Sequence, residues 1–280
     1  MGGKDYLILL EYPVKPAHRY GYGKPAHPQI SAILEKARPS LVKRLSGFAQ
    51  LKEWLDRIPR QAPAEAHEPY WGQGWFGGLD AVALYGMLCE FRPKKFIEVG
   101  SGNSTKFARR AIRDHSLPTK IISIDPRPRA EVDRLCDSIT RAPMEEVDLT
   151  VFDQLQPGDF LFIDSSHRTL PNSDVTVAFL DVIPRLQRGV IVHVHDIFWP
   201  YDYPPAWASR SYSEQYLLGA YLLGDGGAKI EILMPNAFVA GDSALVQVCA
   251  PLLEMPGIQW SQNPDAWPNG ISGGSFWLRV

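Results

Sequence analysis

The chain has 280 residues, 45% of them hydrophobic, which is enough for one large buried core. Its formal net charge of −2 gives no general attraction to nucleic acid or to an anionic membrane, so neither is expected as a partner. The three cysteines show no Cys-x-x-Cys spacing, and the apolar run Leu7 to Leu10 is too short for a signal peptide or a membrane span. We therefore expect a cytoplasmic protein with free thiols.

The N-terminal part is predicted to be a cap on the core. Residues 1 to about 30 are rich in Pro, Gly, His and Tyr, which predicts irregular structure. Apolar residues then recur every three or four positions from Ile30 to Leu55, which predicts one or two helices broken near Pro39. We expect residues 1–78 to form this irregular and helical cap.

The segment from Tyr70 to Gly78 is rich in both aromatic residues and glycine. Such a loop could close over a ligand or could plug the bottom of the core, and the sequence favours neither.

From Leu79 onward the chain alternates between helix and strand patterns, which predicts an α/β domain over residues 79–280. The predicted strands are 95–99, 120–125, 147–151, 159–164, 189–195, about 229–234 and 275–280. The predicted helices are 79–91, 104–114, 129–138, 172–186 and 212–223.

The first predicted strand ends at Glu98-Val99 and breaks into the turn Gly100-Ser101-Gly102 before an amphipathic stretch. Glycine allows positive φ and close approach of the backbone to a ligand, while Asn103 or Ser104 can cap the following helix. About twenty residues later the second strand ends at Asp125, the spacing at which a carboxylate can accept hydrogen bonds from ribose hydroxyls. Together these features indicate a nucleotide-cofactor site.

The details of the turn favour one kind of cofactor. Thr105 replaces the third glycine of the dinucleotide-binding pattern, and Glu98 stands where it could accept hydrogen bonds from an amino-acid moiety. Such a site suits S-adenosylmethionine, which has a ribose, an ammonium and a carboxylate but no pyrophosphate. The predicted cofactor contacts are Glu98, Gly100, Ser101, Gly102, Asn103, Ser104, Asp125 and Asp164.

Four motifs stand in order at the ends of four predicted strands: Glu98 to Gly102, Ile122 to Asp125, Asp159 to His167, and Gly189 to Asp196. With them the chain resembles the class I S-adenosylmethionine-dependent methyltransferases, specifically methyltransferase family 24, over about Gly78 to Leu223. The resemblance implies a Rossmann-like fold. Its sheet has seven mostly parallel strands, an antiparallel C-terminal strand and helices on both faces.

Two pairs of residues could activate a methyl acceptor. Asp164 with His167 follows the fourth predicted strand, and His195 with Asp196 ends the fifth. Parallel strands present their carboxyl ends at one edge of a sheet, so we expect these four side chains to meet. His167, His195 and Asp196 are the predicted catalytic residues.

Three roles remain open for these residues. A divalent cation such as Mg²⁺ could activate the acceptor; similarity to metal-dependent catechol-type O-methyltransferases implies Asp164 and Asp196 as its ligands, with His195 and Ile197 as departures from that family. Alternatively, His195 or His167 could be a general base. In the third interpretation, the acids and imidazoles hold only cofactor and backbone. His193 is expected to be buried and without a chemical role.

The aromatic loop from Ile197 to Trp207 follows the predicted catalytic strand. Tyr201, Tyr203, Arg210 and Tyr212 are predicted to contact the acceptor, although these aromatic residues could instead pack the loop onto the core. The predicted function is transfer of a methyl group from S-adenosylmethionine to a hydroxyl oxygen of a small molecule.

Three alternatives to this function remain. One is an NAD-dependent oxidoreductase, and another is a non-catalytic cofactor-binding module. The third is a metalloenzyme that uses His193, His195 and Asp196, although period-two alternation predicts that His195 and Asp196 point to opposite sides of their strand. The sequence does not predict the oligomeric state.

Overall fold

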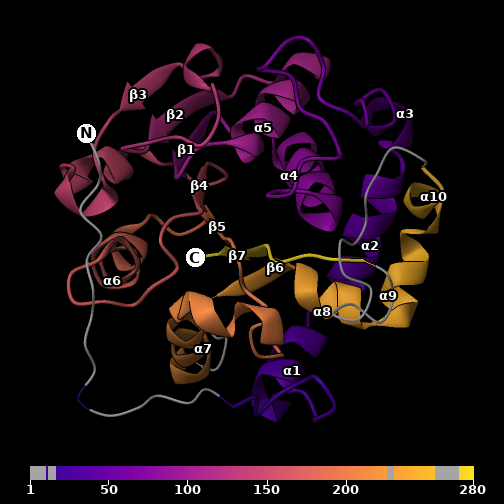
Figure 1. The fold of residues 1–280 in the computed structure, drawn as a ribbon, viewed down its shortest axis with the longest axis vertical. Helices are drawn as coiled ribbons and strands as arrows, with labels where there is room; N and C mark the ends of the chain where they lie inside the picture. Colours follow the sequence, from indigo (N-terminus) through magenta and orange to yellow (C-terminus); the bar gives the residue numbers. More distant parts are fainter. Residues whose placement is uncertain (1–10, 12–16, 226–229, 256–270) are drawn as a thin grey trace.

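A computed structural model describes residue 11 and residues 17–225, 230–255 and 271–280. Within these ranges the fold is built on a seven-stranded sheet of order β3-β2-β1-β4-β5-β7-β6 (Figure 1). The strands are β1 (Lys95–Val99), β2 (Lys120–Ile124), β3 (Ser138–Thr140), β4 (Phe160–Ile163), β5 (Ile191–Val194), β6 (Glu231–Pro235) and β7 (Phe276–Arg279).

Strands β1 to β5 pair in parallel, and β7 runs antiparallel to both of its neighbours, β5 and β6. The central strands are buried along their length, since helices cover both sides of the sheet. This arrangement confirms the predicted Rossmann-like sheet with its antiparallel final strand. The order reverses between β1 and β4, so the crevice at the carboxyl ends of these strands is where a ligand is expected.

Figure 1 shows α4 and α5 on one side of the sheet, and α6 and α7 on the other. From residue 78 onward the described α-helices are α4 (Gly78–Phe91), α5 (Asn103–Asp114), α6 (Asp174–Val177), α7 (Glu214–Asp225), α8 (Asn236–Gly241), α9 (Ser243–Val248) and α10 (Ala250–Leu253). The helix predicted at 172–186 is segmented: α6 is followed by a π-helical turn, Ala178–Val182, and a 3-10 turn, Ile183–Arg185.

The N-terminal helices are α1 (Pro28–Glu35), α2 (Arg38–Ala49) and α3 (Lys52–Leu55). Pro39 stands in the first turn of α2, where a missing N–H costs no helical hydrogen bond, so the predicted break near it is confirmed. The irregular segment predicted at 1–30 mostly precedes α1, and its residues 1–10 and 12–16 lie outside the described ranges. No helix of the described residues has the length and apolar character needed to cross a membrane.

The connection between β2 and β4 was predicted wrongly. Residues 129–138 are not a helix but an irregular segment with one short 3-10 turn, Asp133–Leu135. The third strand is Ser138–Thr140 instead of 147–151, because the Asp137 carboxylate accepts a hydrogen bond from Ile121 N (2.9 Å) and draws the chain alongside β2. At 149–154 the chain forms a 3-10 helix, Leu149–Gln154, which the Asp148 side chain caps by accepting from Thr150 N (3.0 Å).

Candidate active site

A cavity of about 960 Å³ opens at the carboxyl ends of β1, β2, β4 and β5. This volume is at the upper end of the range for small-molecule sites, roughly 300–1,000 Å³, so there is room for a cofactor and a small second substrate. Predicted site residues that line it are Gly100, Ser101, Gly102, Asn103, Ser104, Asp125, Asp164, His167, His195, Asp196, Arg210 and Tyr212. The fold therefore brings together side chains from four separate motifs.

The turn after β1 is fixed by backbone contacts that only glycine permits. Gly100 has φ of +82°, and a Cβ on it would stand 1.8 Å from the carbonyl oxygen of Asp164. The next residue, Ser101, donates its backbone N–H to Asp125 Oδ2 at 2.7 Å. The other oxygen of Asp125 accepts from Arg127 N at 2.6 Å. The acid at the end of β2 thus holds the glycine turn and its own loop while it lines the cavity.

Glu98 is buried behind the cavity wall and does not line the cavity, so its contact with the cofactor stays a prediction. Its side chain is fully buried, and its two oxygens accept hydrogen bonds from the hydroxyls of Ser104 and Thr105. Burial raises the pKa of this carboxyl to about 8, against the lowering effect of the two hydroxyls. Glu98 therefore acts on the site by fixing the start of α5.

The N-cap of α5 is Gly102, and neither Asn103 nor Ser104 has the predicted capping role. Thr105 Oγ1 accepts the backbone N–H of Gly102 at 3.0 Å, which explains a threonine where dinucleotide sites have glycine. Asn103 instead donates its side-chain amide to Gln73 Oε1 at 2.9 Å. This hydrogen bond ties the glycine turn to the aromatic loop of residues 70–78.

The aromatic loop, residues 70–78, is partly buried in the core and partly lines the cavity. Trp71 and Phe76 are buried in the core, where Trp71 packs against Phe107. Trp75, in contrast, is 65% exposed, lines the cavity and has the Arg129 guanidinium 4.8 Å above its ring. One part of the loop plugs the core, while the other forms a wall of the site.

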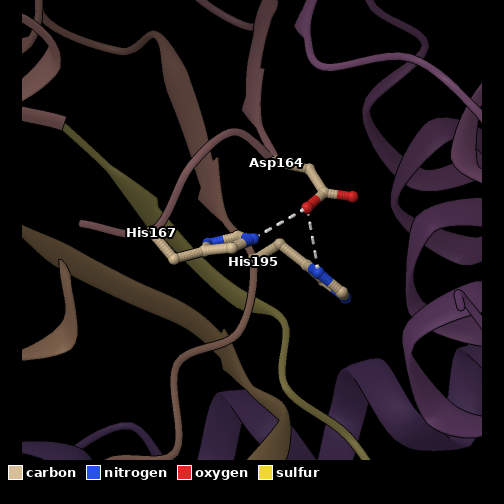
Figure 2. A group of neighbouring side chains, drawn as sticks. All are labelled: Asp164, His167 and His195. Atoms are coloured by element: carbon tan, nitrogen blue, oxygen red, sulfur yellow. Dashed lines mark ion pairs between the residues drawn. The ribbon is translucent and has the colours of Figure 1, made fainter. Parts of the chain in front are cut away.

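A cluster of two imidazoles and two carboxylates stands at the ends of β4 and β5. Asp164 Oδ1 lies 3.2 Å from His167 Nε2 and 3.3 Å from His195 Nδ1, as Figure 2 shows. The Asp196 carboxylate lies 3.4 Å from His167 Nε2 and 3.5 Å from His195 Nδ1. The ligand atoms of Asp164, His167 and His195 are all within 4.8 Å of one another, so these three could hold one metal ion.

The backbone explains how residues of adjacent positions reach the same spot. Strand β5 ends at Val194, and Asp196 has a left-handed conformation with φ of +55°. This turn brings Asp196 to the side that His195 faces, so the prediction that they point to opposite sides is wrong. His167 is likewise left-handed, with φ of +59°. Such conformations are costly for residues other than glycine, and they concentrate at functional sites.

Each imidazole also has a carboxylate behind it. His167 Nδ1 lies 2.9 Å from Oε2 of Glu214, the first residue of α7. His195 Nε2 lies 3.6 Å from Oδ2 of Asp80, in the first turn of α4. Asp80 in turn accepts backbone N–H groups from Gly274 and Ser275. Glu214 and Asp80 are not among the predicted site residues, and both reach the cluster through the packing of helices distant in the chain.

Opposite charges control the ionisation of this cluster. Burial alone raises the pKa of Asp164, but His195 and His167 hold it well below its usual range. Burial disfavours charge on the two imidazoles, yet the surrounding carboxylates, with Asp196 and Asp164 foremost, raise both pKa values well above the usual range. The surrounding carboxylates therefore favour the charged form of both imidazoles.

His193 takes no part in the cluster. It is fully buried, stacks on the ring of Phe162 at 3.7 Å and lies with Nε2 2.8 Å from the hydroxyl of Ser275. Burial holds its pKa well below the usual range. The alternative metal set of His193, His195 and Asp196 does not form, since the structure groups His195 with Asp164 and His167.

The loop after β5 divides between packing and the site. Arg210 and Tyr212 line the cavity, and the Arg210 guanidinium lies 3.8 Å from the centre of the Trp207 ring. Tyr203 faces a second hollow, and its hydroxyl accepts the N–H of Gln215 at 3.1 Å. Tyr201 packs between Gly21 and Gly241. Tyr201 and Tyr203 thus anchor the loop and do not line the large cavity, and their contact with an acceptor stays a prediction.

Other residues that line the cavity were not predicted as site residues: Gln73, Trp75, Arg127 and Arg129. Gln73 and Trp75 belong to the aromatic loop, for which the sequence left open whether it closes over a ligand or plugs the core. Arg127 and Arg129 lie shortly after Asp125 in the sequence, and this position just after the second strand could have indicated them.

Comparison with known proteins agrees with this geometry. A family model described as a methyltransferase domain, that of methyltransferase family 24, matches residues 97–197. A search of curated proteins finds no match for the chain. The matched segment runs from within β1 to just after β5, and so it includes Asp125, Asp164, His167, His195 and Asp196. The match over these residues and the seven-stranded sheet support a class I S-adenosylmethionine-dependent methyltransferase domain.

Proposed function

We propose that this protein transfers a methyl group from S-adenosylmethionine to a hydroxyl oxygen of a small-molecule acceptor. The observation that carries the proposal is one cavity with two chemically different ends. The glycine turn and Asp125 form one end, and the cluster of Asp164, His167, His195 and Asp196 forms the other. A cofactor at the first end would present its methyl group towards the second.

The cofactor end suits the parts of S-adenosylmethionine. The Asp125 carboxylate, held by Ser101 N and Arg127 N, keeps lone pairs that could accept ribose hydroxyls. The exposed ring of Trp75, beside Arg129, offers a flat surface of the kind on which an adenine stacks. The turn from Gly100 to Ser104 is left for the amino-acid part of the cofactor.

The opposite end suits a hydroxyl, which must lose its proton for methyl transfer at neutral pH. Carboxylates lie near the ring nitrogens of His167 and His195 and raise the pKa of both imidazoles, which disfavours either ring as the acceptor of an incoming proton. We therefore assign the proton acceptor to Asp196. Arg210 and Tyr212, across the same cavity, would orient the acceptor.

The transfer itself is an in-line displacement. A bond forms between the acceptor oxygen and the methyl carbon as the bond between that carbon and the sulfonium sulfur breaks, and S-adenosylhomocysteine leaves. The acceptor proton passes to Asp196. The chain contributes mainly by aligning oxygen, methyl group and sulfur and by keeping the proton acceptor at the oxygen.

The test uses S-adenosylmethionine with a labelled methyl group and pairs of aromatic and sugar acceptors that differ only in hydroxyl against amine. The expected product is a methyl ether. Asp196→Asn should lower kcat about 10²- to 10⁴-fold while cofactor affinity stays within twofold. Asp153→Asn, an exposed residue paired with Arg185, is the matched control. Methylation of amines alone, or full turnover by Asp196→Asn, would overturn the proposal.

A further inference from the structure

We infer that Asp164, His167 and His195 form a binding site for a borderline divalent transition metal, such as Zn²⁺, Fe²⁺ or Co²⁺, in preference to Mg²⁺. The inference concerns the same cavity as the proposed function and deepens it by naming how the acceptor oxygen is held. Metal binding can nevertheless be measured without methyl transfer.

The spacing of the three side chains fits a single ion. Ligand atoms about 2.1 Å from one metal lie roughly 3.0–3.5 Å from one another. Asp164 Oδ1 lies 3.2 Å from His167 Nε2 and 3.3 Å from His195 Nδ1. All three ligand atoms fall within 4.8 Å of one another, and the three side chains converge from two neighbouring strand ends (Figure 2).

His195 supplies an independent observation. The residue is 5% exposed, and neither of its ring nitrogens has a hydrogen-bond partner within the described part of the chain. The nearest carboxylate oxygens to these nitrogens belong to Asp164 and Asp80, at 3.3 and 3.6 Å. The carboxylates near this buried ring make no hydrogen bond to it, and a metal at Nδ1 would give the imidazole a direct partner.

The carboxylates behind the imidazoles match the surroundings of metal ligands. A histidine that binds a metal through one nitrogen commonly directs its other nitrogen to a carboxylate, which fixes the ring. His167 directs Nδ1 to Glu214 at 2.9 Å, and His195 directs Nε2 towards Asp80. Both rings thus turn one nitrogen to the centre and the other to a buried acid.

The choice of metal follows from the donor atoms. Mg²⁺ prefers oxygen ligands, and the catechol-type site that the sequence suggested would need carboxylates where this chain has imidazoles. Two imidazoles and one carboxylate suit a borderline transition metal with open positions. Such an ion lowers the pKa of a coordinated hydroxyl. Asp196, beside both inward nitrogens, then stays available as the proton acceptor.

The experiment titrates chelator-treated, full-length protein with Co²⁺, Zn²⁺ or Mg²⁺ in a calorimeter, and it records the visible absorption of the Co²⁺ form. We expect one equivalent of Co²⁺ or Zn²⁺ to bind at least 100-fold more tightly than Mg²⁺. His167→Gln and His195→Gln should each weaken Co²⁺ binding at least 100-fold and remove the absorption band. His115→Gln, an imidazole outside the cavity lining, is the control and should bind Co²⁺ like the wild type.

Glu214→Gln provides a second test if a ligand variant fails to fold, and it should weaken Co²⁺ binding 10- to 100-fold. Unchanged Co²⁺ affinity in folded His167→Gln and His195→Gln, or tighter binding of Mg²⁺ than of Co²⁺, would overturn the inference. Co²⁺ binding without methyl transfer to any hydroxyl acceptor would contradict the proposed function alone. Methyl transfer by chelated protein that binds no metal would contradict this inference alone.

Discussion

The carboxylate of Asp125 accepts a 2.7 Å hydrogen bond from the backbone N–H of Ser101 and so joins the end of β2 to the glycine turn after β1. One acid thereby fixes the loop that is expected to hold the cofactor's amino-acid part and also lines the cavity where the ribose is expected. The two halves of the cofactor site are therefore mechanically linked through Asp125.

Asp125→Ala should weaken S-adenosylmethionine binding at least tenfold, because it removes a charged acceptor and also releases Ser101 N and Arg127 N. Hydrogen bonds to charged groups are each worth about 1.5–3 kcal/mol. The measurement is calorimetric titration of wild type and variant. Asp133→Asn, which alters an exposed acid paired with Arg141, is the control and should bind like the wild type. Equal affinity of Asp125→Ala and wild type would show that the ribose assignment is wrong.

The glycines of the turn should respond differently to alanine. Gly100→Ala forces a Cβ to within 1.8 Å of the Asp164 carbonyl oxygen at a positive φ, so it should cost several kcal/mol of stability or prevent folding. Gly102→Ala adds a Cβ with no atom within 4 Å, and it should fold normally but crowd the cavity and weaken cofactor binding.

Gly47→Ala is the control for these substitutions. Gly47 lies inside α2 with open space around it, so this change should raise stability by about 0.5–1 kcal/mol. Thermal and denaturant unfolding of the three variants gives the comparison. A Gly100→Ala protein as stable as Gly102→Ala would contradict the close approach of β1 and β4 ends described above.

Glu98 should make stability depend on pH. Its pKa of about 8 in the folded protein exceeds the ordinary 4.5, so the folded state binds more protons than the unfolded state between these values. The free energy of unfolding should therefore fall as pH rises from about 4.5 to about 8. Glu98→Gln removes this contribution, and its stability relative to wild type should improve by about 4 kcal/mol between pH 5 and 8.5.

Urea unfolding of both proteins at several pH values measures this difference. Glu53→Gln, at an exposed position of α3, should show no such trend. A stability gap between wild type and Glu98→Gln that stays constant with pH would mean that Glu98 is ionised in the fold throughout.

The two tryptophans of the aromatic loop should separate stability from binding. Trp71→Ala empties a buried site and should cost about 3–5 kcal/mol of unfolding free energy. Trp75→Ala removes a ring that is 65% exposed, so it should change stability by less than about 0.5 kcal/mol but weaken cofactor binding several-fold. Denaturation and titration on both variants test this. Cofactor affinity of Trp75→Ala equal to that of the wild type would show that this ring does not contact the cofactor.

The sequence predicted the strand ends well because each acid or glycine there follows a short apolar run, and parallel pairing alone brings such ends together. It failed at the third strand, where Asp137 and Asp148 make local hydrogen bonds that override strand propensity. The hydrogen bonds from Ser104 and Thr105 to Glu98 were not predicted either, because spacing along a strand does not reveal them.

The surroundings of the imidazoles could not be predicted for a different reason. Glu214 and Asp80 approach His167 and His195 only because α7 and α4 pack beside the sheet edge. No local pattern in the chain encodes these contacts. The separation of Tyr201 and Tyr203 from the cavity likewise depends on how the loop folds back onto Gly21, Gly241 and Gln215.

The most direct test of the account is calorimetric titration of the protein with S-adenosylmethionine, S-adenosylhomocysteine and NAD. We predict micromolar binding of the first two, each excluding the other, and no binding of NAD, since the turn lacks the third glycine of a pyrophosphate site. Binding of NAD without binding of S-adenosylmethionine would contradict the account. It would mean that the glycine turn and Asp125 bind a dinucleotide cofactor.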